Sequence, residues 1–161
     1  MNQDYGAGEF VTDSSYIYQV TEVKLVKDNK GKEEYYMYYK PAWGSDKVYT
    51  ASIPIENLKK TGIRKMLTTD EIKKVYKDLK NKEIEAEYNS LVIKEMIFSN
   101  NLESIVSVLI YYWIRMATLT KTDLEIVEQM MARLCQEISM VTKKEPSVIR
   151  GEIESILKKR S

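Results

Sequence analysis

The sequence predicts an α+β protein in two parts: a small, partly open β-barrel over residues 1–66 and an all-α bundle of about five helices over residues 67–161. Residues 1–68 hold five of the six Gly and two of the three Pro, which punctuate short strands and turns. Residues 69–161 repeat apolar side chains at helical spacing, with one Gly and one Pro among them. The border is therefore expected near residues 63–69.

Three strands are expected in the first part. Residues 15–26 are rich in Tyr, Val, Ile and Thr, which suit a pleated surface. The polar segment 27–32 contains a Gly and predicts a turn, so residues 34–40 form the second strand of a hairpin. Residues 47–53 form the third strand, which Pro54 ends. Strands this short predict a small barrel that keeps at least one edge strand.

The first three helices of the second part follow from caps and apolar spacing. Thr68 and Glu71 have the spacing of a capping box, which starts the first helix. A second helix is expected over residues 84–98, and the segment 99–101 supplies a stop and a new cap. The third helix, over residues 102–116, places its apolar side chains on one face.

The last two helices carry the clearest periodicity. Thr122 and Glu125 form a second capping-box spacing, and apolar residues from 124 to 141 then recur at intervals of 3, 4, 3, 4 and 3. Pro146 fits the first turn of the final helix. These stripes are interpreted as packed core, and Cys135 as a small apolar core residue instead of a nucleophile.

The composition excludes several kinds of catalytic and metal site. The chain has no His, which excludes a Ser-His-Asp triad, a Cys-His pair and His metal ligands. Its single Cys excludes an internal disulfide and a Cys-based zinc site, and no Gly-x4-Gly-Lys phosphate loop occurs. We therefore expect no enzyme and no cofactor. A carboxylate enzyme is the alternative; a metal-dependent activity abolished by EDTA would reveal it.

Charge and hydropathy narrow the expected partners. A net charge of +1 argues against a protein that coats nucleic acid by charge alone. Residues 1–5 lack the basic and apolar segments of a secretory signal. The longest apolar stretch, residues 105–116, is broken by Ser107 and Arg115 and is too short to span a bilayer. We expect a cytoplasmic protein with no membrane partner and no small-molecule substrate.

One run of residues resembles a known signature. The chain reads Ile53-Pro54-x-Glu56-Asn57-x4-Gly62-x-Arg64 and then opens a helix with Thr-Asp-Glu. This run is similar to the "VP-x-EN…G-x-R" signature of the CarD/CdnL family of bacterial transcription regulators. The N-terminal domain of that family is shared with the transcription-repair coupling factor. The resemblance covers nearly the whole chain and is stronger in the first half.

The resemblance implies a Tudor/SH3-like barrel that binds the β subunit of bacterial RNA polymerase, and a helical domain that touches promoter DNA and modulates open-complex stability. It assigns the polymerase contact to Lys24, Val26, Thr50 and Ser52. Lys24 matches a basic position of the family. Ser52 stands at the other basic position and cannot form the same ion pair.

The DNA-facing half departs further from the family. The resemblance assigns DNA contact to Tyr88, Asn89, Lys94 and Lys121, but no Trp stands where relatives carry a minor-groove wedge. Residues 69–161 hold 15 basic and 15 acidic side chains, so DNA contact is expected to be weak or dependent on the polymerase. The alternative is a protein–protein interaction module that does not bind DNA directly.

Overall fold

The computed structural model describes residues 4–43 and 50–160. It divides into two compact units, with the border between Lys65 and Met66. The α+β class is confirmed, because the described residues form a five-stranded antiparallel sheet and six α-helices, five of which follow the last strand. The first of these helices is a single turn that belongs to the first unit.

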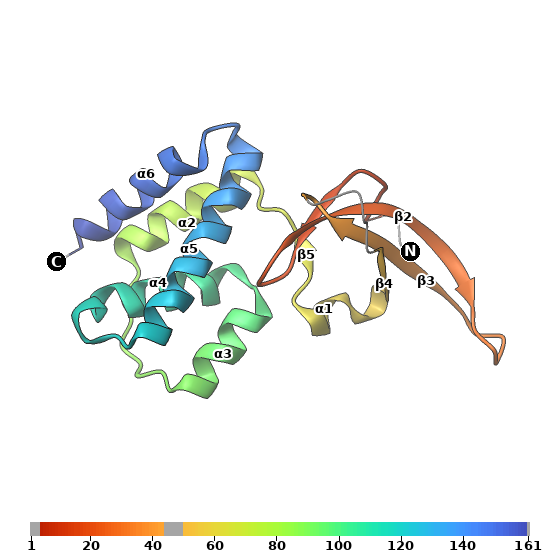
Figure 1. Cartoon of the computed structure of the whole chain (residues 1–161), viewed down its shortest axis with the longest axis horizontal. Helices are drawn as coiled ribbons and strands as arrows, with labels where there is room; N and C mark the ends of the chain where they lie inside the picture. Colours follow the sequence, from red (N-terminus) through yellow and green to blue (C-terminus); the bar gives the residue numbers. More distant parts are fainter. Residues whose placement is uncertain (1–3, 44–49, 161) are drawn as a thin grey trace. The chain divides into compact units, whose positions relative to one another are not determined.

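The sheet of the first unit is open. Its strand order is β4-β3-β2-β1-β5, and every neighbouring pair is antiparallel, so within the described residues β4 and β5 are the end strands. The bounds are Phe10–Thr12 for β1, Ile17–Lys27 for β2, Glu33–Pro41 for β3, Ala51–Pro54 for β4 and Arg64–Lys65 for β5. The long β2–β3 hairpin dominates the sheet (Figure 1).

The predicted hairpin is confirmed, and its turn has a clear cause. The Asp28 carboxylate accepts hydrogen bonds from the backbone N–H of Lys30 and of Lys32, at 2.8 and 2.9 Å. Gly31 has φ of 81°, a left-handed conformation that costs a glycine little. The local sequence of the turn therefore sets the register of the two strands.

The other strands were predicted less well. The third predicted strand, residues 47–53, starts partly outside the described residues; in the structure β4 begins at Ala51, and Thr50 lies just before it. The sequence did not predict β1 and β5. They have three and two residues, too few for an alternating pattern to be visible, and long-range pairing defines them.

A short connection joins the two end strands. The 3-10 helix η1 (Ile55–Asn57) and the helix α1 (Leu58–Thr61) follow β4, and Gly62 ends α1 with φ of 73°. A left-handed Gly after the last helical residue is the usual helix stop. The buried Leu58 and Ile63 of this connection pack with Val11, Val20, Met37 and Ile53, which form the core of the first unit.

The second unit is a bundle of five α-helices in the described residues. They are α2 (Thr69–Asn81), α3 (Ser90–Ser99), α4 (Leu102–Ile114), α5 (Lys121–Thr142) and α6 (Pro146–Lys158), with the 3-10 helix η2 (Met116–Thr118) between α4 and α5. The longest helix, α5, packs against α2, α4 and α6 (Figure 1). None of the helices in the described part of the chain is both long and apolar enough to cross a membrane.

The helix boundaries confirm some predictions and correct others. The capping box of Thr68 and Glu71 is confirmed. The predicted helix over 84–98 is wrong in its first part, because α3 begins only at Ser90. There the side chain of Asn89 accepts a 2.9 Å hydrogen bond from the backbone N–H of Val92. That bond satisfies one of the free donors of the first turn, so the helix starts at this residue.

The second predicted capping box is misplaced by two residues. The structure forms the box with Thr120 and Asp123, and α5 therefore starts at Lys121. The two alternatives have the same spacing, and Asp serves in place of the expected Glu. The predicted third helix is also shorter than expected, since α4 ends at Ile114.

Candidate functional site

Three of the four residues assigned to polymerase contact lie on one face of the sheet. In the strand register Lys24 pairs with Tyr36, and Ser52 pairs with Tyr38. Residues two apart on a strand point the same way, so these side chains and Val26 share a face. Met37 and Ile53 point to the opposite, core side. We name the outer surface formed by Glu22, Lys24, Val26, Tyr36, Tyr38 and Ser52 the Lys24 face.

Lys24 is a positioned cation on that face. Its Nζ lies 3.2 Å from Oε1 of Glu22 and 4.6 Å from the ring centroid of Tyr38. The hydrogen bond and charge of Glu22 raise the pKa of Lys24, so its ammonium is charged at neutral pH. About half of the Lys24 side chain is exposed. An acidic group of a partner can therefore reach it.

The Lys24 face ends at β4. Within the described residues β4 pairs only with β3, so its other side offers backbone N–H and C=O groups to a partner strand. Ala51 and Ser52 of β4 are exposed, and so is Thr50 just before it. Addition of a partner's strand at such an edge is a recurrent mode of protein recognition.

The four residues assigned to DNA contact gather around one cavity in the helical unit. Tyr88 and Lys94 line a cavity of about 490 Å³, together with Tyr111, Tyr112 and Arg115. Asn89 directly precedes the lining residue Ser90, and Lys121 lies between two lining threonines, Thr120 and Thr122. We name this cavity the tyrosine cavity. The fold thus brings together residues that are 33 positions apart.

Two of these four side chains are engaged within the protein. The Tyr88 ring lies 4.8 Å from the ring of Tyr111, whose hydroxyl donates a 3.2 Å hydrogen bond to the carbonyl of Tyr88. Tyr88 is half-buried and packs on the helical core. Asn89 caps α3 through its side chain. Tyr88 and Asn89 therefore both have a structural role within the helical unit.

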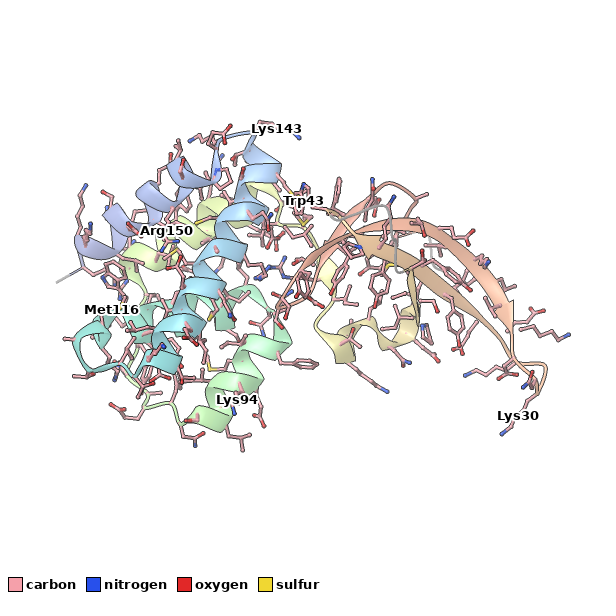
Figure 2. The ribbon with its side chains drawn as sticks, in the orientation of Figure 1. Lys30, Trp43, Lys94, Met116, Lys143 and Arg150 are labelled. Carbon is pink, nitrogen blue, oxygen red and sulfur yellow. The ribbon has the colours of Figure 1, made fainter. Side chains whose placement is uncertain are left out.

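Lys94 and Lys121 remain available for a partner. Both are exposed, and Lys94 projects from α3 (Figure 2). No ion pair of either lysine is found within residues 4–43 and 50–160. Lys94 in the lining and Lys121 beside it are therefore exposed cations near a half-buried Tyr, while the carboxylate of Asp123 also lines the tyrosine cavity.

Sequence reasoning missed Arg115 as a part of this site. Its guanidinium carbon lies 3.7 Å from the ring centroid of Tyr111, and its Nη2 lies 3.0 Å from Oε1 of Glu87. Its Nη1 donates to the backbone carbonyl of Tyr111. In the sequence Arg115 is visible only as a charged residue that interrupts an apolar stretch. Such a residue marks the end of an amphipathic helix as often as it marks a binding site.

Two further kinds of reactive group in the described residues are metal-ligand clusters and the single thiol. No group of three or more His, Cys, Asp or Glu residues in the described chain could hold a metal ion. Cys135 is buried, and burial raises the pKa of its thiol to about 11. Little of it is therefore the reactive thiolate at neutral pH.

No protein-family model and no curated protein matches this chain. The resemblance to the CarD/CdnL family therefore rests on the residues quoted above. Its most specific run, residues 53–64, forms the connection from β4 through η1 and α1 to β5.

Proposed function

We propose that this protein is a CarD-like regulator, which binds the β subunit of bacterial RNA polymerase through its N-terminal unit and modulates the stability of the promoter open complex. The observation that carries the proposal is the shared Lys24 face. Lys24, Val26 and Ser52 come from β2 and β4, and the register places them together beside an exposed sheet edge. A polymerase strand added at β4 would bring a partner's acidic side chain toward Lys24.

The proposal includes the fold of the first unit, which we take to be an open form of a Tudor/SH3-like barrel. The sheet is not closed in the described residues, but two features favour a curled sheet. A β-bulge interrupts the β2–β3 register between Val20 and Glu22, and such bulges bend a strand and occur at barrel rims. The end strands β4 and β5 are also joined by only residues 55–63, most of them helical.

Within this proposal, the absence of a cation at the family's second basic position changes the balance of interactions in the polymerase contact. Lys24 supplies one charge, and Ser52 supplies only a hydroxyl at the family's other basic position. The backbone of β4 would then contribute a larger share of the contact. We expect an interface with moderate salt dependence, because one ion pair is screened by salt and backbone hydrogen bonds are much less so.

A second candidate function is a protein–protein module that does not bind DNA directly. It is favoured by the engagement of Tyr88 with Tyr111 and of Asn89 as a helix cap, which occupies two of the four expected DNA contacts. The balanced charge of residues 69–161 points the same way. In that case the tyrosine cavity and its lysines would contact another protein of the transcription machinery.

The proposal is tested by charge reversal on the Lys24 face. Lys24→Glu should weaken binding of the full chain to the isolated β1 region of a bacterial RNA polymerase by about tenfold or more, because an attractive contact becomes repulsive. Binding is measured by biolayer interferometry. Lys30→Glu is the matched control, since Lys30 is also an exposed lysine but lies at the hairpin tip (Figure 2).

The two variants separate the outcomes. Loss with Lys24→Glu and retention with Lys30→Glu support the Lys24 face. Equal weakening by both variants would indicate only general electrostatic attraction. Absence of binding by the folded wild-type chain would contradict the polymerase proposal itself.

A further inference from the structure

The core-facing side of the β2–β3 hairpin extends beyond the core it covers. Val23 pairs with Met37 on this side, and both pack in the core of the first unit. The next pair on the same side is Leu25 and Tyr35. These two side chains are 49% and 40% exposed, although in the preceding pair Met37 is fully buried and Val23 is half-buried. The hairpin thus leaves an apolar surface that its own unit does not cover.

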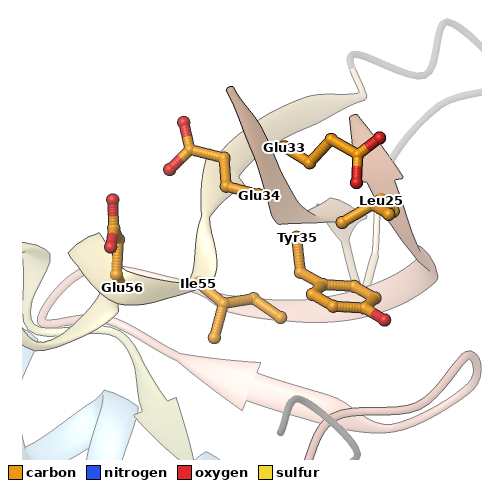
Figure 3. A pocket seen from close by; sticks show the side chains of 6 residues that line it. All are labelled: Leu25, Glu33, Glu34, Tyr35, Ile55 and Glu56. Atoms are coloured by element: carbon orange, nitrogen blue, oxygen red, sulfur yellow. The ribbon is translucent and has the colours of Figure 1, made fainter. Parts of the chain in front are cut away.

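This surface forms one wall of a groove of about 440 Å³. The groove is lined by three apolar and three acidic side chains, which are Leu25, Tyr35, Ile55, Glu33, Glu34 and Glu56. Figure 3 shows Ile55 beside Tyr35, the carboxylates of Glu34 and Glu56 on the same side of the groove, and the Glu33 carboxylate near Leu25. We name it the acidic groove. Ile55 packs against the core, so the groove floor is continuous with it.

The charge around the groove is negative. Among the residues that the structure describes, its lining contains three carboxylates and no cation. Two lysines compensate part of this charge. Lys32, at the hairpin turn, lies 4.0 Å from Glu34 and 3.6 Å from Glu56, and Lys27 pairs with Glu33 in the strand register. Because Lys32 is 63% exposed, a partner's cation can displace it at little cost. Nucleic acid and acidic peptides are disfavoured here by like charge.

We propose that the acidic groove binds a peptide segment of another protein in which apolar side chains are flanked by Lys or Arg. The exposed Leu25 and Tyr35 provide the apolar contact, and the three carboxylates select the flanking cations. Leu25 and Tyr35 face the opposite side of the sheet from Lys24 and Ser52. Glu34, which pairs with Val26, lies where the acidic groove meets the Lys24 face. The peptide is a partner other than the polymerase, so this proposal goes beyond the polymerase contact and does not depend on it.

The probe is a fluorescein-labelled nonapeptide with two leucines near its centre and two lysines on each side. Its binding to the full chain is followed by fluorescence anisotropy. Leu25→Asp should weaken binding about tenfold or more, because it places a charge against the apolar side chains. Leu91→Asp is the matched control, since Leu91 is an exposed leucine, at 66%, on α3 of the other unit.

A second pair of measurements tests the charges. Glu56→Lys should weaken binding of the same peptide, and a peptide with glutamates in place of its lysines should not bind. Glu56 is exposed, so its replacement leaves the fold intact. Peptide binding that Leu25→Asp and Glu56→Lys weaken, and Leu91→Asp does not, would support the proposal.

Three results would overturn it. Equal binding of the lysine and glutamate peptides would show that the charges do not select the partner. Equal loss in Leu25→Asp and Leu91→Asp would place the peptide elsewhere. A self-association seen by analytical ultracentrifugation and abolished by Leu25→Asp would identify a second copy of the chain as the occupant. None of these results bears on the Lys24→Glu experiment, so the two proposals fail separately.

Discussion

At the scale of single residues, the helical unit contains a buried ion pair between Arg133 and Glu137. Glu137 of α5 is fully buried, and its Oε2 accepts a 2.8 Å hydrogen bond from the backbone N–H of Leu67. Its Oε1 accepts from Arg133 at 3.3 Å, and Arg133 also donates to the side chain of Asn100. This network ties the segment before α2 and the α3–α4 break to one turn of α5. A buried ion pair is stable only when additional hydrogen bonds satisfy the remaining polar atoms of both side chains.

We expect Glu137→Ala to lower the free energy of unfolding by about 3–5 kcal/mol, because it removes the carboxylate that balances the buried Arg133 guanidinium and accepts from the Leu67 N–H. Urea denaturation followed by circular dichroism measures the loss. Glu125→Ala, on the exposed side of the same helix, should change the stability by about 0.5 kcal/mol or less. Similar values for the two variants would mean that the network does not stabilise the fold.

At the scale of elements, helix starts were predictable in kind but not always in position. Thr68 and Thr120 both form capping boxes, and both follow the rule that a Thr precedes an acidic residue by three positions. Around α5 two overlapping Thr–acid pairs satisfy the rule equally. Burial does not separate the two Thr–acid pairs either, because residues 120–122 are all exposed in the structure.

The matched pair Thr120→Ala and Thr122→Ala tests this assignment. Thr120→Ala should lower the free energy of unfolding by about 1 kcal/mol, because the backbone N–H of Asp123 loses its acceptor. Thr122→Ala should be close to neutral, since no capping bond depends on it. Thermal unfolding of the two variants gives the comparison. A larger loss for Thr122→Ala would restore the cap predicted at Thr122.

At the scale of the whole molecule, both parts of the chain have nearly balanced charge, with 10 basic and 9 acidic side chains in residues 1–68. The helical part is balanced, with 15 basic and 15 acidic side chains in residues 69–161. Only Lys94 and Lys121 of the expected DNA contacts are exposed cations. Any direct DNA binding should therefore release few counterions.

We expect a shallow salt dependence for binding of the full chain to fork DNA. Two phosphate contacts predict a slope of log K against log salt concentration of about −2, and the double variant Lys94→Glu with Lys121→Glu should bring it toward zero. Fluorescence anisotropy over a salt series gives both slopes. A wild-type slope near about −5 would show a larger basic surface than these two lysines provide. An unchanged slope in the double variant would place the DNA contact elsewhere.

The sequence by itself determined the features that depend on near neighbours. The α+β class, the Asp28 turn and the cap at Thr68 each follow from residues within a few positions of one another. The regular spacing of apolar residues in α5 likewise predicts that one face of this helix is packed in the core. It also assigned Cys135 to the core, where the structure places it.

Only the tertiary structure decided the features that join distant segments. The pairing of β1 with β5, the assembly of Tyr88, Arg115 and Thr120 around one cavity, and the exposure of Leu25 beside Ile55 depend on contacts between residues far apart in the chain. A strand of two residues is too short to show an alternating pattern. A leucine in a strand does not reveal whether other residues pack over its face of the sheet. The physical reason is that burial is a property of the packed fold, whereas turns and caps are satisfied by local hydrogen bonds.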